Sequence, residues 1–313
     1  MDLFDAAKKV LENNMGVKPG EPVLIVTDDE KLPIGQALYR AACALGAEAA
    51  LAVTPPAPVA GAEPPAAVAA AMRAARVVVC PTAQSITHTA ARIEAVKSGA
   101  RVATMPGITE KMFREGAITA DYARVRELTV RLTELLTRAE RAVLEKNGRT
   151  LTLALGGRNG IPSTGIYRNA GESGNLPSGE AYIAPLEDGS DGTMEIDGSM
   201  VGIGKLDSPL TITVEKGRLR EISGQGAEKL AVLFENEQNG TLCELGIGTN
   251  EKAALCGIVL EDEKVYGTVH LAFGTNLSFG GTVKAGCHLD GVILRPTLSL
   301  DGMTVLRNGE FQL

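Results

Sequence analysis

The sequence contains no tryptophan, few aromatic residues and only three histidines. Aromatic residues make up 4% of its 313 positions, which argues against the stacking platforms that bind single-stranded nucleic acids. The formal net charge is −7, whereas binding to a phosphate backbone requires clustered lysine and arginine. We therefore expect no nucleic acid among its partners.

Long apolar runs and common cofactor motifs are also absent. No run approaches the roughly 20 apolar residues that span a bilayer, and the N-terminal stretch MDLFDAAKKVLENN has the mixed charge of an amphipathic helix rather than a signal peptide. We expect a cytoplasmic protein without a membrane partner. The five cysteines are widely spaced without a CxxC pair, which favours free thiols over a disulfide framework or a cysteine zinc site. Without a GxGxxG or P-loop motif, a nucleotide cofactor is not expected.

The length of the chain favours two domains, and its first part has the rhythm of an α/β fold. Short apolar runs alternate with helical patterns, which predicts a mostly parallel, doubly wound, Rossmann-like sheet. Strands are expected at 22–28, 47–53, 75–81 and 100–107, and helices at 32–46, 68–75 and 88–99. One long helix is predicted from Asp121 to Lys146, and Gly148 stands where a helix-ending glycine would. We place the domain boundary there, so that the N-terminal domain comprises residues 1–148.

The remaining residues, 149–313, are rich in strand-like segments. These segments are separated by tight-turn pairs such as Asp188-Gly189 and Asn308-Gly309. The one clear helical pattern spans residues 226–240. The sequence predicts a C-terminal α+β domain built on a curved sheet or a partial barrel.

The strongest local candidate for chemistry is the segment Cys287-His288-Leu289-Asp290. If it is extended, His288 and Asp290 point to the same face, because side chains in a strand alternate with period two. An imidazole and a carboxylate at this spacing can share a metal ion. A simple hydrogen bond between the two on a sheet surface is the alternative.

Three further residues lie in apolar surroundings, where a polar side chain needs a partner. His270 is in a strand-like stretch, and a buried imidazole there would bind a metal or a backbone carbonyl. Glu180 and Glu244 are flanked by apolar and glycine residues, and burying an unpaired carboxylate is costly. A metal, a lysine or an arginine would pair with each glutamate, and a half-exposed strand position is the simpler alternative.

Together these five residues have the composition of a two-metal hydrolase site. They also contain two histidines and a carboxylate, the ligand set of mononuclear Fe(II) oxygenases. The spacing alone leaves open whether Glu180, Glu244, His270, His288 and Asp290 converge.

Four of these segments resemble, in order, motifs of the aminopeptidase T-like family of metallopeptidases. NLPSGEAYIAP is similar to the family segment that carries the first metal glutamate, which gives Glu180. CELGIGTN stands where the bridging glutamate occurs, which gives Glu244. VHLAFG and CHLDGVI resemble the two histidine motifs and give His270, His288 and Asp290.

The resemblance implies a pair of divalent ions such as zinc or cobalt, a peptide or related small-molecule amide as substrate, and a homodimer. Glu244 would bridge the ions, and a metal-activated water would attack the scissile carbonyl. Glu263 is the spare carboxylate nearest to His270 in the sequence, and it is the candidate general base.

Three departures from this family count against peptide hydrolysis more than against metal binding. Leu277 stands where the family has a tyrosine ligand, the gap of 18 residues from His270 to His288 is shorter than in the aminopeptidases, and so is the whole chain. A related branch of similar fold comprises ring-cleaving dioxygenases of dihydroxypyridines, whose single Fe(II) ion is held by two histidines and an aspartate, matching His270, His288 and Asp290. That branch has no use for the two glutamates, so a metal-dependent hydrolase is the first expectation, a dioxygenase the second and an inactive metal-binding homologue the third.

Overall fold

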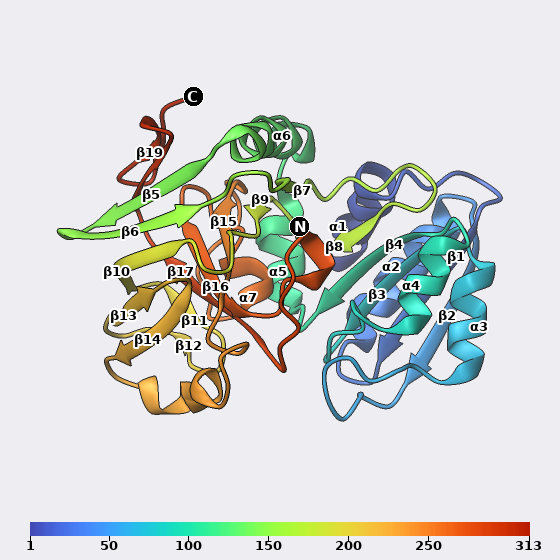
Figure 1. Cartoon of the computed structure of the whole chain (residues 1–313). Helices are drawn as coiled ribbons and strands as arrows, with labels where there is room; N and C mark the ends of the chain where they lie inside the picture. Colours follow the sequence, from blue (N-terminus) through green and yellow to red (C-terminus); the bar gives the residue numbers. More distant parts are fainter. The chain divides into compact units, whose positions relative to one another are not determined.

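The computed structural model describes residues 1–313, which divide into two compact units (Figure 1). The first contains Met1–Ala123 and Gly165–Ser178, and the second contains Arg124–Thr164 and Gly179–Leu313. The first unit thus ends at Ala123 rather than at the expected Gly148, and residues 165–178 return to it. None of the helices combines the length and apolar character needed to cross a membrane.

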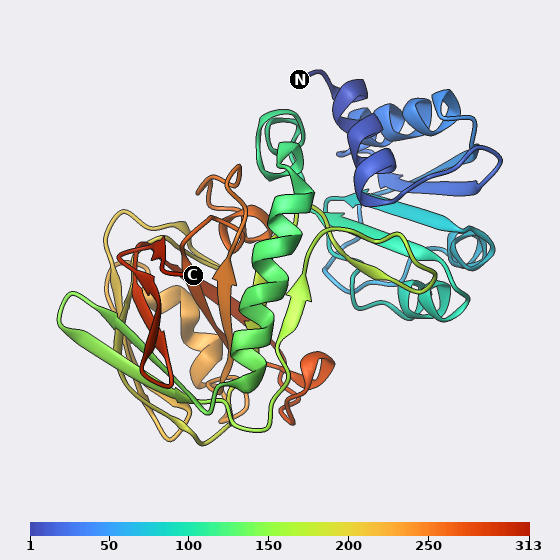
Figure 2. The same ribbon diagram turned by 90° about the horizontal axis from the view of Figure 1, so that it is seen from above.

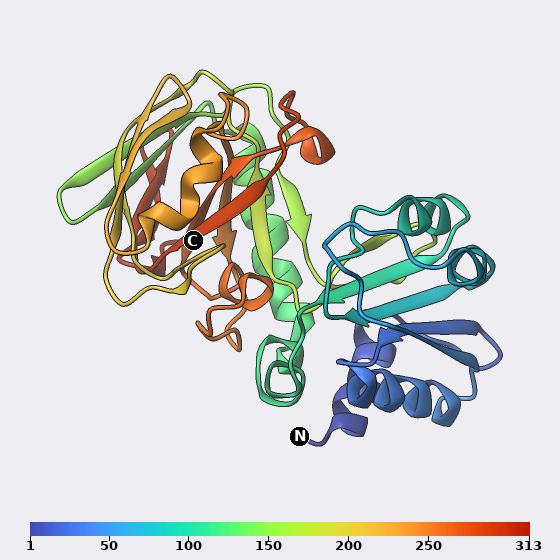
Figure 3. The same cartoon turned by 90° about the horizontal axis from the view of Figure 1, so that it is seen from below.

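The N-terminal unit is built on a parallel sheet with the strand order β2-β1-β3-β4-β8. Helices α1 and α2 lie on one face of this sheet, and α3 and α4 lie on the other (Figures 2 and 3). Its strands are β1 (Pro22–Asp28), β2 (Glu48–Thr54), β3 (Val77–Thr82), β4 (Arg101–Pro106) and β8 (Ser173–Asn175). Its helices are α1 (Leu3–Lys9), the π-helix η1 (Val10–Asn14), α2 (Leu32–Ala44), α3 (Ala66–Ala74), α4 (Ala90–Lys97), α5 (Glu110–Glu115) and the 3-10 helix η2 (Ala117–Thr119).

The predicted parallel α/β domain is confirmed. The central strand β3 is buried along its whole length, and β1 is buried from Val23 onward. Central strands of a sheet covered on both faces form continuous apolar runs, which is why the sequence located them well. Strand β8 was not predicted, because Ser173-Gly174-Asn175 has no apolar pattern and joins the sheet only through pairing with β4.

The C-terminal unit contains two antiparallel sheets and most of helix α6 (Tyr122–Arg138). One sheet has the order β14-β13-β10-β6-β5-β18-β19-β20, and the other has the order β12-β11-β17-β16-β15-β9-β7. The strands of the first are β5 (Arg141–Lys146), β6 (Arg149–Ala154), β10 (Ser190–Ile196), β13 (Leu210–Glu215), β14 (Arg218–Ser223), β18 (Thr297–Leu300), β19 (Met303–Arg307) and β20 (Glu310–Phe311). The strands of the second are β7 (Ile161–Ser163), β9 (Glu180–Ile183), β11 (Ser199–Met200), β12 (Gly204–Lys205), β15 (Leu242–Gly248), β16 (Val269–Gly274) and β17 (His288–Ile293).

Both sheets and α6 contribute side chains to one apolar core. It contains Leu132 of α6, Leu153 and Met194 of the first sheet, and Leu245 and Leu271 of the second. The expected strand-rich character of this part of the chain is confirmed. Short helical segments complete the unit, namely α7 (Val259–Asp262) and the 3-10 helices η3 (Ala227–Phe234) and η4 (Leu277–Phe279).

The predicted helix from Asp121 to Lys146 is wrong over its last part. Helix α6 ends at Arg138, and Arg141–Lys146 form the strand β5, which pairs with β6. Asn147 and Gly148 connect the strands, both with positive φ, as a two-residue type I′ hairpin turn requires. Gly148 therefore closes a hairpin and does not end a helix. The helix expected over 226–240 is likewise shorter, and it is the 3-10 helix η3.

The face of β16 that packs into the core should tolerate truncation poorly. We predict that Leu271→Ala lowers the free energy of unfolding by about 2–5 kcal/mol, because Leu271 is fully buried in the core. Urea denaturation followed by circular dichroism measures this change. Leu277→Ala is the matched control, because Leu277 is 51% exposed and should shift stability by less than about 0.5 kcal/mol. Equal effects of the two variants would contradict this packing.

Candidate metal centre

Strand register places four of the candidate residues on one face of the second sheet. Directly opposed residues of antiparallel strands point to the same face, as do residues two apart along one strand. Glu244 of β15 pairs with Ala272 of β16, which pairs with Asp290 of β17. His270 and His288 precede Ala272 and Asp290 by two residues. All four side chains therefore project from the same side.

Glu180 reaches the same face from the neighbouring strand β9. It pairs with Gly248, which is four residues beyond Glu244 on β15. The five residues singled out in the sequence are thus brought together on adjacent strands, as the alternation of side chains requires.

The opposite face of these strands packs into the apolar core. The residues that alternate with the candidate ligands are buried there, including Ala181, Leu245, Leu271 and Phe273. A shift of any one strand by one residue would exchange a core residue for a polar one. The core therefore holds the polar side chains in their register.

A β-bulge at Cys243 sets the orientation of Glu244. Leu242 pairs with Phe273, whereas Glu244 pairs with Ala272, so two residues of β15 advance the pairing by one residue of β16. In a regular ladder, Glu244 would lie opposite Leu271 and point into the core. The bulge turns its carboxylate to the polar face.

Gly246 makes room for the imidazole of His270, its partner in the ladder. A Cβ atom at this position would lie 2.0 Å from His270 Nε2, a separation that real structures do not show. Glycine is therefore needed here for space, since the ring of His270 lies over β15.

Glu244 lies between the two histidines. Its Oε1 is 3.3 Å from His270 Nε2, and its Oε2 is 3.3 Å from His288 Nε2. His288 Nε2 is also 3.4 Å from Asp290 Oδ1. All but His288 are at least 90% buried, and the side chain of His288 is 30% exposed.

A backbone carbonyl fixes the orientation of His288. The Nδ1–H group of His288 donates to the carbonyl oxygen of Thr275 over 2.9 Å. A carbonyl can only accept, so in the neutral ring Nε2 carries the lone pair that faces the carboxylates. Metal-binding histidines typically have such a partner on the second nitrogen.

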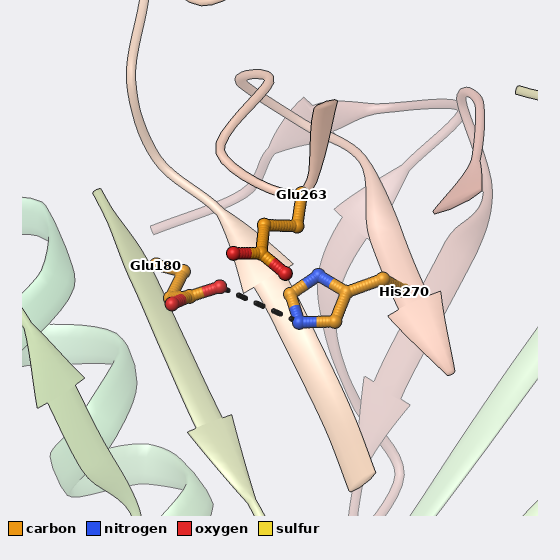
Figure 4. Close-up of side chains that lie close together, drawn as sticks. All are labelled: Glu180, Glu263 and His270. Atoms are coloured by element: carbon orange, nitrogen blue, oxygen red, sulfur yellow. Dashed lines mark ion pairs between the residues drawn. The ribbon is translucent and has the colours of Figure 1, made fainter. Parts of the chain in front are cut away.

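A second group of side chains adjoins His270 on the other side. Figure 4 shows the carboxyl groups of Glu180 and Glu263 and the imidazole of His270 pointing toward one another. Glu180 Oε2 is 3.5 Å from His270 Nε2. The fully buried Lys264 donates from Nζ to Glu180 Oε1 over 2.7 Å and also to Glu263 Oε1.

Lys264 was not foreseen from the sequence. It closes the run Glu261-Asp262-Glu263-Lys264, whose charges suggest a solvated turn. The segment that carries this lysine pairs with the end of β15 through the bridge between Asn250 and Val265, and its backbone lies close to Gly248. No local pattern in the sequence reports that placement.

Burial and charge pairing shift the protonation of these groups. Burial opposes ionisation of Glu244, but its hydrogen bonds to His270 and His288 outweigh burial and lower its pKa to about 2. Burial likewise opposes the charged form of His270, yet Glu244 and Glu180 raise its pKa to about 9. The pKa of His288 is also raised well above 6.5 by Asp290 and Glu244, against the effect of burial. Metal-free, the site therefore holds protonated imidazoles at neutral pH.

Glu263 differs from Glu244 in this respect. Burial is the main effect and raises the pKa of Glu263 to about 8, only partly offset by Lys264. The pKa of Lys264 is raised by Glu180 and Glu263 in spite of its burial, so it carries a charge. Glu263 is thus a carboxyl group that can exchange a proton near neutral pH.

The donor set fits a divalent metal ion. The side chains form two groups, and within each group the donor atoms lie within 4.8 Å of one another. The first group contains Glu244, His270 and Asp290, and the second contains Glu180, Glu263 and His270. Glu180 Oε2, His270 Nδ1 and Asp290 Oδ1 are buried without a hydrogen-bond partner. The nitrogen–oxygen separations of 3.3–3.5 Å exceed a good hydrogen bond, but they match the roughly 3–3.5 Å between donors that share an ion at bond lengths of about 2.0–2.2 Å.

The space at Gly246 gives a first test of this centre. We predict that Gly246→Ala weakens Zn²⁺ or Co²⁺ binding by at least about tenfold, because the new methyl group displaces the His270 ring. Isothermal titration calorimetry measures the affinity. Gly286→Ala is the control, since a Cβ there meets its nearest atom at 3.7 Å. Unchanged affinity in Gly246→Ala would show that His270 does not bind the ion.

Metal affinity should rise with pH. An ion must displace the proton of His270, whose pKa is about 9, so apparent affinity should increase about tenfold per pH unit for each proton displaced, up to about pH 9. The raised imidazole pKa stabilises the metal-free fold at low pH, and that stabilisation is lost as pH rises from about 6.5 towards 9. Calorimetric titrations between about pH 6 and 8 test the slope, and a flat profile would count against protonated imidazoles.

Comparison with known proteins shows a family for nearly the whole chain. A family model described as NicX, 2,5-dihydroxypyridine 5,6-dioxygenase, matches residues 2–313. No curated protein matches the sequence significantly.

Two solved structures share the fold. The 2,5-dihydroxypyridine dioxygenase from Pseudomonas putida KT2440 superposes with a TM-score of 0.80 at 20% identity, over 99% of this chain and 96% of that one. Wild-type AmpT from Thermus thermophilus superposes with a TM-score of 0.75 at 17% identity, over 99% of each chain. The resemblance to aminopeptidases thus extends to the fold, which the two enzymes have in common. The match along residues 2–313 shows that the chain belongs to the 2,5-dihydroxypyridine 5,6-dioxygenase (NicX) family.

Proposed function

We propose that this chain is a ring-cleaving dioxygenase that uses one Fe(II) ion and acts on a dihydroxylated aromatic ring of the dihydroxypyridine class. The observation that carries the proposal is the set of His270, His288 and Asp290 on one sheet face. Two histidines and one carboxylate are the ligand set of mononuclear Fe(II) oxygenases. The family to which the chain belongs is described by this reaction, which supports the same choice.

The three ligands would be positioned by different means. His288 is oriented by Thr275, His270 by the space at Gly246, and Asp290 by its place on β17. Three protein ligands leave coordination positions open for small molecules. When bound there, Fe(II) supplies the one-electron chemistry through which molecular oxygen reacts with an aromatic ring.

Glu263 has the properties of the proton acceptor for a ring hydroxyl. Its pKa of about 8 lies close to neutral pH, where a general base is most effective. Its side chain is 14% exposed, whereas its partner Lys264 is fully buried. We assign to Glu263 the removal of a hydroxyl proton from the substrate, in place of the water activation expected from the aminopeptidase resemblance.

Aromatic rings lie beside His288. Phe279 of η4 lies edge-on to His288 with ring centres 6.0 Å apart, and it meets Tyr182 in the same geometry at 5.4 Å. Planar aromatic substrates pack well against such rings. This surrounding suits an aromatic ring better than an extended peptide.

A two-metal hydrolase of the aminopeptidase type is the second candidate. One observation favours it, which is that Glu180, Glu263 and His270 form a second group of donors that shares His270 with the first. Two ions held close together by such overlapping groups are typical of aminopeptidases. Zinc, cobalt and a dimeric assembly belong to this candidate.

Activity with two substrates separates the candidates. We expect the anaerobically Fe(II)-loaded protein to consume oxygen with 2,5-dihydroxypyridine and to leave leucine p-nitroanilide intact with Zn²⁺ or Co²⁺. Asp290→Asn should reduce oxygen uptake by at least about 100-fold, because a ligand is lost. Asp207→Asn, at an exposed position, is the control and should retain full activity. Anilide hydrolysis without oxygen uptake would reject the dioxygenase and support the hydrolase.

A further inference from the structure

We propose that Lys264 is a built-in cation that takes the place of a second metal ion and limits the centre to one divalent ion per chain. The inference rests on the proposed metal centre, and it assigns a role to a residue that neither candidate ligand set contains. It concerns how many ions the chain binds, and not which reaction follows.

The first observation is the position of the ammonium group. Lys264 is 0% exposed, and its Nζ donates to one oxygen each of Glu180 and Glu263. These are two of the three residues in the second donor group, with His270 as the third (Figure 4). The chain therefore already places one positive charge against these carboxylates.

The second observation is that this donor group is otherwise suited to an ion. Its three donor atoms lie within 4.8 Å of one another. Glu180 Oε2 and His270 Nδ1 are both buried without a hydrogen-bond partner, and both residues are more than nine-tenths buried. Without the lysine, the group would offer two carboxylates and an imidazole to a metal.

An ion and the ammonium group exclude one another at this place. A divalent ion bound to Glu180 and Glu263 would lie a few ångströms from Lys264 Nζ, where like charges repel strongly because little water screens them. Binding would also compete for the oxygens that pair with the lysine, and an unpaired buried ammonium is costly. The second ion is thus disfavoured both by repulsion and by the loss of an ion pair.

The first donor group has no such cation. Neither Glu244 nor Asp290 forms an ion pair with a lysine or an arginine, and their charged neighbours are His270 and His288. A neutral imidazole offers a ring nitrogen lone pair to an ion, whereas an ammonium group offers none. This asymmetry directs a single divalent ion to the side of Glu244 and Asp290.

Counting bound ions tests the inference without any activity measurement. We expect Zn²⁺- or Co²⁺-saturated wild-type protein to retain one ion per chain after dialysis, measured by native mass spectrometry and elemental analysis. Lys264→Met, which keeps the length of the side chain and removes its charge, should bind two. The second ion should bind at least about 100-fold more tightly to Lys264→Met than to the wild type.

Two further variants complete the test. Lys264→Arg keeps the charge and should retain one ion, and Lys252→Met removes an exposed lysine and should also retain one. Two tightly bound ions in the wild type, or a folded Lys264→Met that still binds one, would overturn the proposal. Two tightly bound ions in the wild type would overturn the proposal even where Lys264→Met fails to fold.

The outcome is separable from that of the proposed function. One ion per wild-type chain without oxygen uptake would count against the dioxygenase and leave the role of Lys264 intact. Two ions in a wild type that consumes oxygen would reject the role of Lys264 and leave the dioxygenase in place.

Discussion

The candidate metal centre depends on three carboxylates that share one face of a sheet and are largely removed from water. Glu180, Glu244 and Asp290 would repel one another strongly if they stood alone, and Glu263 lies beside Glu180 at the end of α7. Two protonated imidazoles and one ammonium group compensate for them in the metal-free chain. A metal ion can replace the protons of the imidazoles. The carboxylates are therefore already ionised, and their negative charge favours binding of a cation.

The positions of the candidate ligands follow from strand pairing, a β-bulge and a glycine rather than from a binding loop. Pairing across β9, β15, β16 and β17 places the donors on one side, and the core on the other side prevents slippage. The bulge at Cys243 and the missing side chain at Gly246 adjust two of the donors. Donors on paired strands are positioned more precisely than donors on loops, as metal binding demands.

Much of the fold could be read from the sequence, for identifiable reasons. β1 and β3 are continuous apolar runs, and their limits were predicted to within two residues. The strand β5 was predicted as helix, because Ala139 and Val143 continue the three- and four-residue spacing of α6 and a glycine at position 148 is as typical of a helix end as of an Asn-Gly hairpin turn. Strand β8 carries no apolar signal and arises only through its pairing with β4.

In the candidate site, too, residues that belong to a local sequence pattern could be predicted, whereas a residue positioned by tertiary contacts could not. The five candidate residues were predicted from strand alternation and from motifs that resemble a known family. Lys264 could not be predicted in this way, because no local pattern distinguishes it from an exposed lysine, and its segment is held by pairing with residue Asn250. The same limit explains why motifs alone favoured a hydrolase, because AmpT and the 2,5-dihydroxypyridine dioxygenase share this fold, and a fold does not determine the reaction.

The position of the candidate ligands on neighbouring strands has a consequence for the stability and the turnover of the protein. An ion held by residues of β15, β16 and β17 would bridge the middle of the sheet, and it would bind only when those strands are assembled. Binding to the folded state alone adds about 2.7 kcal/mol of stability when free metal is at 100 times its dissociation constant. Metal starvation would therefore loosen the C-terminal unit itself, and its proteolytic turnover would follow the supply of the ion.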